Sequence, residues 1–162
     1  MNNMKVLYIG HYREDSGWGN WGCEQIRALD SVGVEVVARP VHLSKSHSAI
    51  PDVVKECEKR SSKGATHCIQ HVLPHYMDFS NKFEKNVGMF CVETSNVLHT
   101  GWPIRFEQMD EIWMPDRHSL NAVKESKIKT TAKVIPIPTD ITKYQQKLGK
   151  LDLGIPEGTF IF

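Results

Sequence analysis

A glycine-punctuated loop near the start of the chain is the first place where residue types and spacing could do chemistry. An apolar run, residues 6–9, ends at Gly10, and Ser-Gly-Trp-Gly-Asn at residues 16–20 leads into a helical pattern. Glycines let a ligand approach the backbone, and free amide groups at a helix start favour anions. The candidates for holding a donor phosphate are Gly17, Trp18, Gly19 and Asn20. The spacing matches neither the dinucleotide fingerprint nor the P-loop, so a plain glycine turn remains an alternative.

Two neighbours of this loop have open roles. Arg13 could contact the same phosphate, or it could be a solvated loop residue. Trp18 could be a lid over a bound substrate or a hydrophobic plug on the core. The sequence does not separate these possibilities.

A second polar group follows the apolar run Asn86–Val92. Glu93 is the candidate catalytic carboxylate, and the alternative is an ordinary polar turn. Polar side chains at the carboxyl ends of parallel strands commonly form binding sites, and an aromatic ring beside them can stack on a sugar. The candidate acceptor-binding residues are Thr94, Ser95, His99, Trp102 and His71.

Three histidines, His67, His71 and His75, are spaced at intervals of four, which would align metal ligands on a helix. Pro74 and the β-prone residues around them argue against that helix. We therefore expect no metal site, and His71 and His75 could instead line a cleft at a strand end.

Apolar runs alternate with helical patterns along most of the chain. This alternation predicts an α/β fold with a doubly wound parallel sheet in three layers. Asp116 is placed to cap one helix. The predicted strands are 5–10, 34–38, 66–72, 86–92, 111–114 and 133–136, and the predicted helices are 20–31, 51–62 and one ending near 126.

Composition limits the functional class. With 162 residues, the chain is sized for one domain. Its formal charge of +1 gives no electrostatic potential strong enough to attract nucleic acid. The four scattered cysteines predict buried thiols, and the lack of a signal segment or long apolar run predicts a cytoplasmic protein. A peripheral membrane contact stays open.

Several segments together resemble the N-terminal half of a retaining glycosyltransferase of the GT-B fold, the group that includes glycogen synthase and many bacterial sugar transferases. The resemblance covers residues 4–162 and depends on order and spacing. It is carried by the opening strand and glycine loop, by Ala28–Val36, by Asp110–Asp116 and by Val134–Asp140. The chain departs from the family pattern at Glu93, where His or Asp is common, at Asp116, where Ser is common, and at Thr139, which replaces Gly.

The resemblance implies a Rossmann-like acceptor-side domain over residues 1–140, one half of a two-domain enzyme. Residues 141–158 would be an interdomain linker, and 159–162 would begin a C-terminal donor-binding domain. The implied reaction transfers a sugar from a nucleotide-sugar to an unknown acceptor with retention, without a cofactor. This fragment alone should then have little activity. The competing hypothesis is a non-catalytic Rossmann-like module that binds a nucleotide or sugar phosphate.

Overall fold

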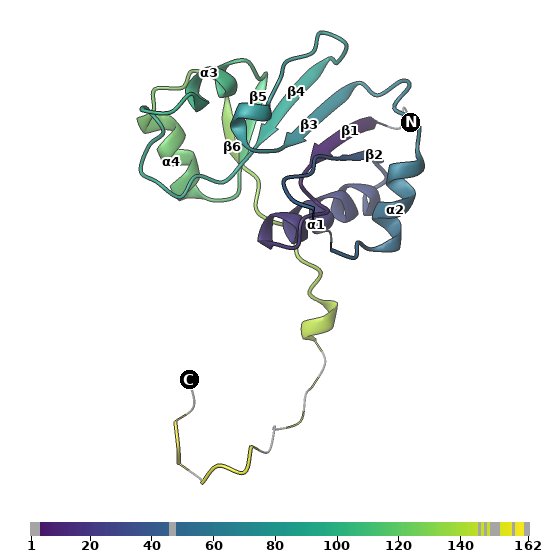
Figure 1. Ribbon diagram of the computed structural model, residues 1–162, viewed down its shortest axis with the longest axis vertical. Coiled ribbons are helices and arrows are strands. Elements are labelled where there is room, and N and C mark those ends of the chain that lie inside the picture. Colours follow the sequence, from purple (N-terminus) through teal and green to yellow (C-terminus); the bar gives the residue numbers. More distant parts are fainter. Residues whose placement is uncertain are drawn as a thin grey trace.

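A computed structural model describes residues 4–45, 48–145, 147, 149, 153–156 and 158–160. Figure 1 shows one sheet with helices around it, and a C-terminal segment that leaves the sheet past α1 (Gly17–Ser31). The fold is α/β with an all-parallel six-stranded sheet, as the alternation of apolar runs and helical patterns predicted.

The sheet changes direction around its first strand. Its order is β2-β1-β3-β4-β5-β6, so the chain runs from β1 to one edge and then returns to the other side of β1. In open parallel sheets, ligands bind at the carboxyl ends beside such a switch point. The strands are β1 (Lys5–Gly10), β2 (Glu35–Pro40), β3 (His67–His71), β4 (Lys85–Met89), β5 (Glu111–Met114) and β6 (Ala132–Val134).

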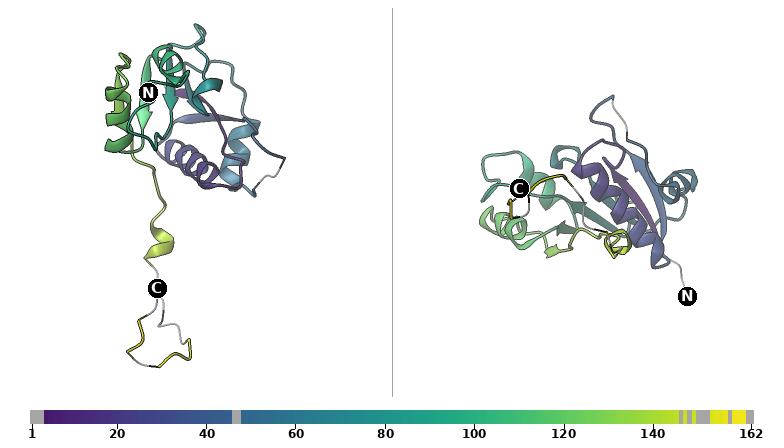
Figure 2. Two further views of the ribbon diagram at one scale, coloured as in Figure 1. Left: turned by 60° about the vertical axis from the view of Figure 1, so that its left-hand side comes forward. Right: turned by 90° about the horizontal axis from the view of Figure 1, so that it is seen from below.

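Helices flank the sheet to give a Rossmann-like, three-layer arrangement. Strand register puts Tyr8, Ile69 and Val87 on one face, and Ile112 on the other. Tyr8 packs in the cluster that contains Ile26 of α1, whereas Ile112 packs with Val123 of α4. Figure 2 shows the strands between α1 and α4. The remaining helices are α2 (Asp52–Lys59), α3 (Trp102–Glu107) and α4 (Arg117–Glu125), with short 3₁₀ turns η1 (Pro74–Tyr76) and η2 (Thr142–Tyr144).

Helix α2 packs beside α1 and closes the outer edge of β2. Arg60 Nη1 donates to the Val36 carbonyl at 3.0 Å and to Asp30 Oδ1 of α1 at 2.6 Å. Arg39 Nη1 donates to the Ala38 carbonyl at 2.7 Å. These guanidinium groups satisfy carbonyls of β2, which has no neighbouring strand on that side among the described residues, so the edge is protected from pairing with another chain.

Capping side chains explain two helix starts. Asp116 accepts from the Ser119 amide at 2.7 Å, which confirms the predicted cap of α4. Ser16 accepts from the Gly19 amide at 3.3 Å, so α1 begins at Gly17 and not at Asn20 as the sequence predicted. A serine cap can start a helix at glycine despite its low helix propensity, because the cap satisfies an otherwise free amide. The glycine loop is therefore the first turn of the helix.

Other boundaries also differ from the predicted ones. Strand β4 ends at Met89, so residues 90–92, predicted as strand, belong to the following loop. Helix α2 ends at Lys59, three residues earlier than predicted. Helix α3 was not predicted at all, since Pro103 at its start reads as a loop residue; Pro is tolerated in the first turn of a helix.

The chain after β6 crosses α1. Asp140 accepts from Arg27 Nη2 at 3.0 Å, and its amide donates to Glu24 Oε2 at 3.3 Å. The predicted linker begins in this segment, whose only regular element within the described residues is η2. Residues 159–160 have no regular secondary structure, and the rest of the predicted strand, 161–162, lies outside the described residues. None of the described helices combines the length and apolar character that crossing a bilayer needs.

Candidate functional site

His11 ties together three strand ends at the switch point. It follows β1 directly and is 1% exposed. Its Nδ1 lies 2.8 Å from the Val41 carbonyl after β2, and the Leu73 amide after β3 donates to its Nε2 at 3.1 Å. Because Nε2 accepts, the proton lies on Nδ1, and His11 is neutral. The loops at the carboxyl edge are therefore fixed relative to one another by one imidazole.

His71, the last residue of β3, lies beneath this clamp in an aromatic environment. Its Nδ1 is 2.7 Å from the Tyr8 hydroxyl. The Trp18 ring stacks on it with centroids 5.1 Å apart, and the Trp21 ring packs edge-on at 4.2 Å. His71 Nε2 and Trp21 Nε1 are buried and have no hydrogen-bond partner among the described residues. His71 thus packs against the Trp18 ring. It does not face the solvent, from which an acceptor would bind.

Burial sets the charge state of both histidines. It lowers the pKa of His11, and the hydrogen bond to Val41 and the charge of Glu14 oppose the shift only in part. Burial, with a smaller contribution from His11, lowers the pKa of His71 to about 3. Since an imidazole loses hydration when buried, the neutral form is favoured. Neither histidine supplies a proton to a ligand at neutral pH.

Beside Trp18, the carboxyl edge is hollowed into a pocket of about 410 Å³. The loop after β1 forms one wall, and the loop after β2 forms the other. The lining residues are Glu14, Asp15, Ser16, Trp18, Leu43 and Ser44. Trp18 also packs on Phe90, with centroids 4.8 Å apart, so the ring that lines the pocket is held in place.

The Glu14 side chain, from the first wall, holds the second wall in place. Its Oε1 accepts from the Leu43 amide at 2.8 Å and the Ser44 amide at 3.4 Å, and its Oε2 accepts from the Ser44 hydroxyl at 2.8 Å. Glu14 as a whole is 7% exposed. A buried carboxylate is stable only with such donors, so Glu14 holds the loop in place and also adds a negative charge to the pocket.

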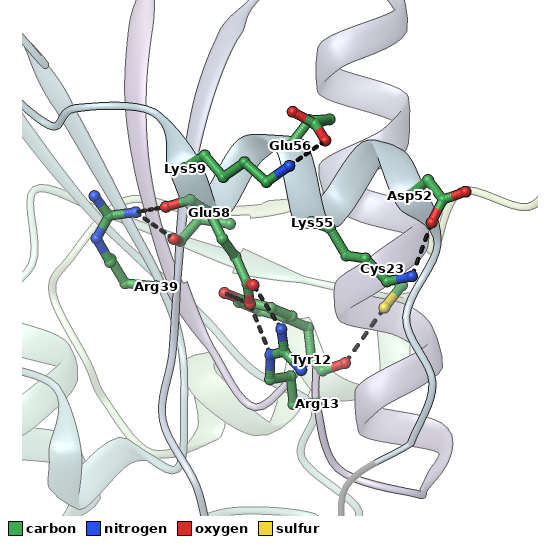
Figure 3. Close-up of polar contacts among 10 residues, drawn as sticks. Tyr12, Arg13, Cys23, Arg39, Asp52, Lys55, Glu56, Glu58 and Lys59 are labelled. Carbon is green, nitrogen blue, oxygen red and sulfur yellow. Dashed lines mark hydrogen bonds and ion pairs between the residues drawn. The ribbon is translucent and has the colours of Figure 1, made fainter.

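Arg13 lies outside this pocket. Its Nε and Nη2 donate to the two carboxylate oxygens of Glu58 at 2.7 and 2.6 Å, and Tyr12 donates to the same group at 3.0 Å. Figure 3 shows Arg13 directed toward α2 and paired with Glu58. The guanidinium ties the β1 loop to α2, so the phosphate contact predicted for it would require this bidentate pair to open.

The residues of the predicted phosphate loop have two different roles. A Cβ at Gly19 would collide with the Glu14 carbonyl, so this glycine permits close packing of α1 on the loop. Gly17 has nothing within 4 Å of the equivalent position. Gly17 and Asn20 border a second groove of about 350 Å³ beneath the C-terminal segment. Its other lining residues are Trp21, Glu24, Ile137, Pro138, Thr139 and Tyr144.

The loop after β4 places the other predicted residues apart from the Trp18 pocket. Glu93, Thr94, Ser95 and His99 are exposed, and none of them lines that pocket. The loop runs along α4, because the Val92 amide donates to Ser119 Oγ at 3.2 Å and the Val97 amide to Ser126 Oγ at 2.8 Å. Trp102 is partly buried and packs edge-on against Phe90 at 5.0 Å, so it lies against the core of this half. The roles predicted for Glu93 and its neighbours stay predictions.

The sequence reasoning missed Tyr8, Glu14, Asp15 and Trp21. The Glu14-Asp15 pair before the glycines is a readable signal, since two carboxylates disfavour a phosphate. The described residues contain no group of three or more His, Cys, Asp or Glu side chains that could hold a metal ion. Cys23, Cys57 and Cys68 are buried and Cys91 is half-buried, all with free thiols.

Comparison with protein-family models, with curated proteins and with solved structures found no match to this chain.

Proposed function

We propose that this chain is the acceptor-binding domain of a retaining glycosyltransferase of the GT-B type. The observation that carries the proposal is the pocket at the switch point, where an indole ring is held beside carboxylates. An aromatic face packs against the C–H groups of a sugar ring, and carboxylate oxygens accept hydrogen bonds from its hydroxyls. The order of sequence segments that resembles this family adds support.

In the proposed reaction, the acceptor hydroxyl oxygen forms a bond to the anomeric carbon of a nucleotide-sugar and the bond from that carbon to the diphosphate oxygen breaks. The nucleoside diphosphate leaves and takes up the hydroxyl proton. This domain would hold the acceptor: Trp18 would stack on its ring, and Asp15 would accept hydrogen bonds from its hydroxyls. A second domain would bind the donor and stabilise the departing diphosphate. Pre-positioned groups of this kind lower the barrier because they need no reorganisation as charge develops.

A second candidate is a non-catalytic module that binds a nucleotide or sugar phosphate. The observation that favours it is the groove beside Gly17, the first residue of the 15-residue helix α1, which has open space around it. Glu24 lines the same groove, and its negative charge opposes an anionic ligand.

Binding to the chain itself distinguishes the two candidates. We would titrate neutral mono- and disaccharides, and separately uridine, guanosine and adenosine diphosphates, while recording tryptophan fluorescence and NMR shifts. The glycosyltransferase proposal expects saturable sugar binding that is lost in Trp18→Ala and largely kept in Trp18→Phe, which retains an aromatic face.

The opposite pattern would support the binding module. Tight nucleotide binding with no sugar binding, weakened by Gly17→Val and unaffected by Trp18→Ala, would overturn the acceptor-domain proposal. A chain that bound neither class would contradict both candidates.

A further inference from the structure

We infer that the sheet surface around Trp113 docks one amphipathic helix of a partner protein, which places apolar side chains against the sheet and a carboxylate beside them. This surface, the Trp113 face, is on the α1 side of β4, β5 and β6. It consists of Lys85, Val87, Glu111, Trp113 and Lys133. It shares no lining residue with the Trp18 pocket, so it is a separate site.

The helices in the described part of the chain leave the Trp113 face without a helix above it. On this side of the sheet, α1 and α2 pack with β1 and β2. Phe106 of α3 and Val123 of α4 pack with Ile112 on the opposite face. Parallel sheets are typically covered on both faces, usually by helices. Strands β4 to β6 span two spacings of about 4.8 Å, and a helix is about 10 Å across, so one helix fills this strip.

A pocket of about 220 Å³ adjoins the Trp113 face. Its lining is apolar apart from one imidazole and one ammonium group, and consists of Met4, Val6, Leu29, Val34, His67, Ile69, Lys85, Val87 and Trp113. None of these residues comes from the segment after β6, which passes α1 at Glu24 and Arg27. Small-molecule sites usually measure about 300–1,000 Å³. The pocket therefore suits a single apolar side chain of a partner, the kind of anchor from which interfaces gain much of their affinity.

Two ammonium groups on this face are placed to receive a carboxylate. Lys85 and Lys133 both donate to Glu111 Oε2, at 2.6 and 3.0 Å. The Trp113 indole donates to Glu111 Oε1 at 2.6 Å, so both carboxylate oxygens are occupied. The side chains of Lys85 and Lys133 are 38% and 55% exposed. An ammonium has three N–H donors, and each lysine uses one here, so both have donors left for an acidic residue of the partner.

Neighbouring acidic residues do not take up these donors. Asp30, which follows Leu29 of the pocket, is paired with Arg60 at 2.6 Å. Glu35, which follows Val34, is paired with Lys5 at 2.7 Å. Strand alternation places the acidic residues that directly precede Lys85 and Glu111 on the opposite face, namely Glu84 and Asp110. An acidic flank on the docked helix therefore complements the Trp113 face, and a basic flank would meet like charge.

The test uses two synthetic helical peptides on the full chain. Each has about 18 residues, long enough to form a helix, with leucines along one face. One peptide carries glutamates beside the leucines, and the other carries lysines. We would titrate both and record NMR shifts of the Trp113 indole and the Val87 and Ile69 methyl groups. We expect shifts at the Trp113 face, and binding of the glutamate peptide at least about fivefold tighter, with a ratio that shrinks at high salt.

Substitutions separate the charge from the apolar anchor. Lys133→Gln should at least halve the ratio, because it removes one ammonium from the face. Lys55→Gln makes the same change on an exposed lysine of α2, away from the face, and should leave the ratio unchanged. Trp113→Ala should weaken the glutamate peptide at least about tenfold, and Trp113→Phe, which keeps an aromatic ring, should weaken it less. The shift map of the unaltered chain locates the peptide even where a variant fails to fold.

Several outcomes would overturn the inference. They are equal binding of the two peptides, no binding of either, and shifts at the Trp18 pocket in place of the Trp113 face. Self-association of the chain that Trp113→Ala abolishes would also overturn it, because a second copy would then occupy the face. Sugar binding, on which the proposed function depends, is tested separately and is unaffected by these results.

Discussion

The two halves of the carboxyl edge are built in different ways. At the ends of β1, β2 and β3, a buried imidazole, a buried carboxylate and stacked rings fix the loops. At the end of β4, the loop that carries Glu93 is held to α4 by two serine hydroxyls, Ser119 and Ser126, and its polar side chains face solvent. The first half is therefore held by buried polar and aromatic contacts, whereas the second presents its polar side chains to solvent.

This difference separates the predicted site residues into two classes. Trp18 belongs to a rigid pocket because its position is determined by packing from several strands. Glu93 lies in a loop that is attached to α4 through Ser119 and Ser126, and its own side chain is exposed. Changes in the first half should therefore affect folding strongly, and changes in the second should affect it little. Four experiments test this contrast.

The largest effect is expected at the start of α1. Gly19→Ala places a Cβ against the Glu14 carbonyl, which is backbone and cannot move aside, so we expect a loss of about 3 kcal/mol in the free energy of unfolding. Gly17→Ala, two residues away with open space around it, should change it by less than about 1 kcal/mol. Urea denaturation measures both. Equal losses in the two variants would mean that α1 does not approach the loop this closely.

His11→Ala should cost nearly as much. Without the imidazole, the Val41 carbonyl and the Leu73 amide lose their partner inside the protein, with an expected loss of about 3 kcal/mol. His99→Ala, in the exposed loop, should change stability by less than about 0.5 kcal/mol. The same denaturation experiment compares them, and a small loss for His11→Ala would contradict the clamp.

Acidification should lower the free energy of unfolding through His71, a buried histidine of the first half. The pKa of His71 in the folded protein is about 3, below its unfolded value of about 6.5, so the folded state binds fewer protons. Its stabilising contribution is present above pH 6.5 and is lost as the pH falls. Between pH 6.5 and 5 the loss should be about 2 kcal/mol.

The titration of Glu111 does not obscure the effect of His71 between pH 5 and 6.5. Burial alone would raise the pKa of Glu111, but hydrogen bonds from Lys85, Trp113 and Lys133 outweigh it and lower the pKa to about 2. Its contribution is therefore lost only below about pH 4.5. Denaturation curves between pH 5 and 6.5 report mainly the buried histidines. His71→Phe should flatten the dependence of the free energy of unfolding on pH. An unchanged slope in that variant would mean that groups other than His71 cause the effect.

The smallest effect is expected where the β4 loop is attached. Ser126→Ala leaves the buried Val97 amide without an acceptor and should cost about 1.5 kcal/mol. Thr94→Ala removes an exposed hydroxyl that bonds within its own loop and should be nearly neutral. Hydrogen exchange at the Val97 amide checks the assignment, since its protection should fall in the Ser126 variant only.

Much of the fold could be predicted from local sequence. Apolar runs bounded by glycine and proline gave all six strands approximately, and Asp116 marked the start of α4. The predicted boundaries were wrong where a tertiary contact determined where the helix or strand begins or ends. Ser16 moved the start of α1. Strand β4 ended at Met89: the Phe90 amide still donates to the Trp113 carbonyl of β5, but the Val92 amide donates to Ser119 Oγ of α4.

By itself, the sequence determined an alternating α/β chain, a parallel sheet, and a glycine-rich connection at the end of its first strand. Only the tertiary structure decided which polar residues meet at that edge. It joined Arg13 to Glu58, buried His71 beneath Trp18, and separated Glu93 from the pocket. The physical reason is that periodicity follows from local backbone geometry, whereas the partners of His11, Tyr8 and Arg13 at this edge lie 30 to 63 positions away in the chain.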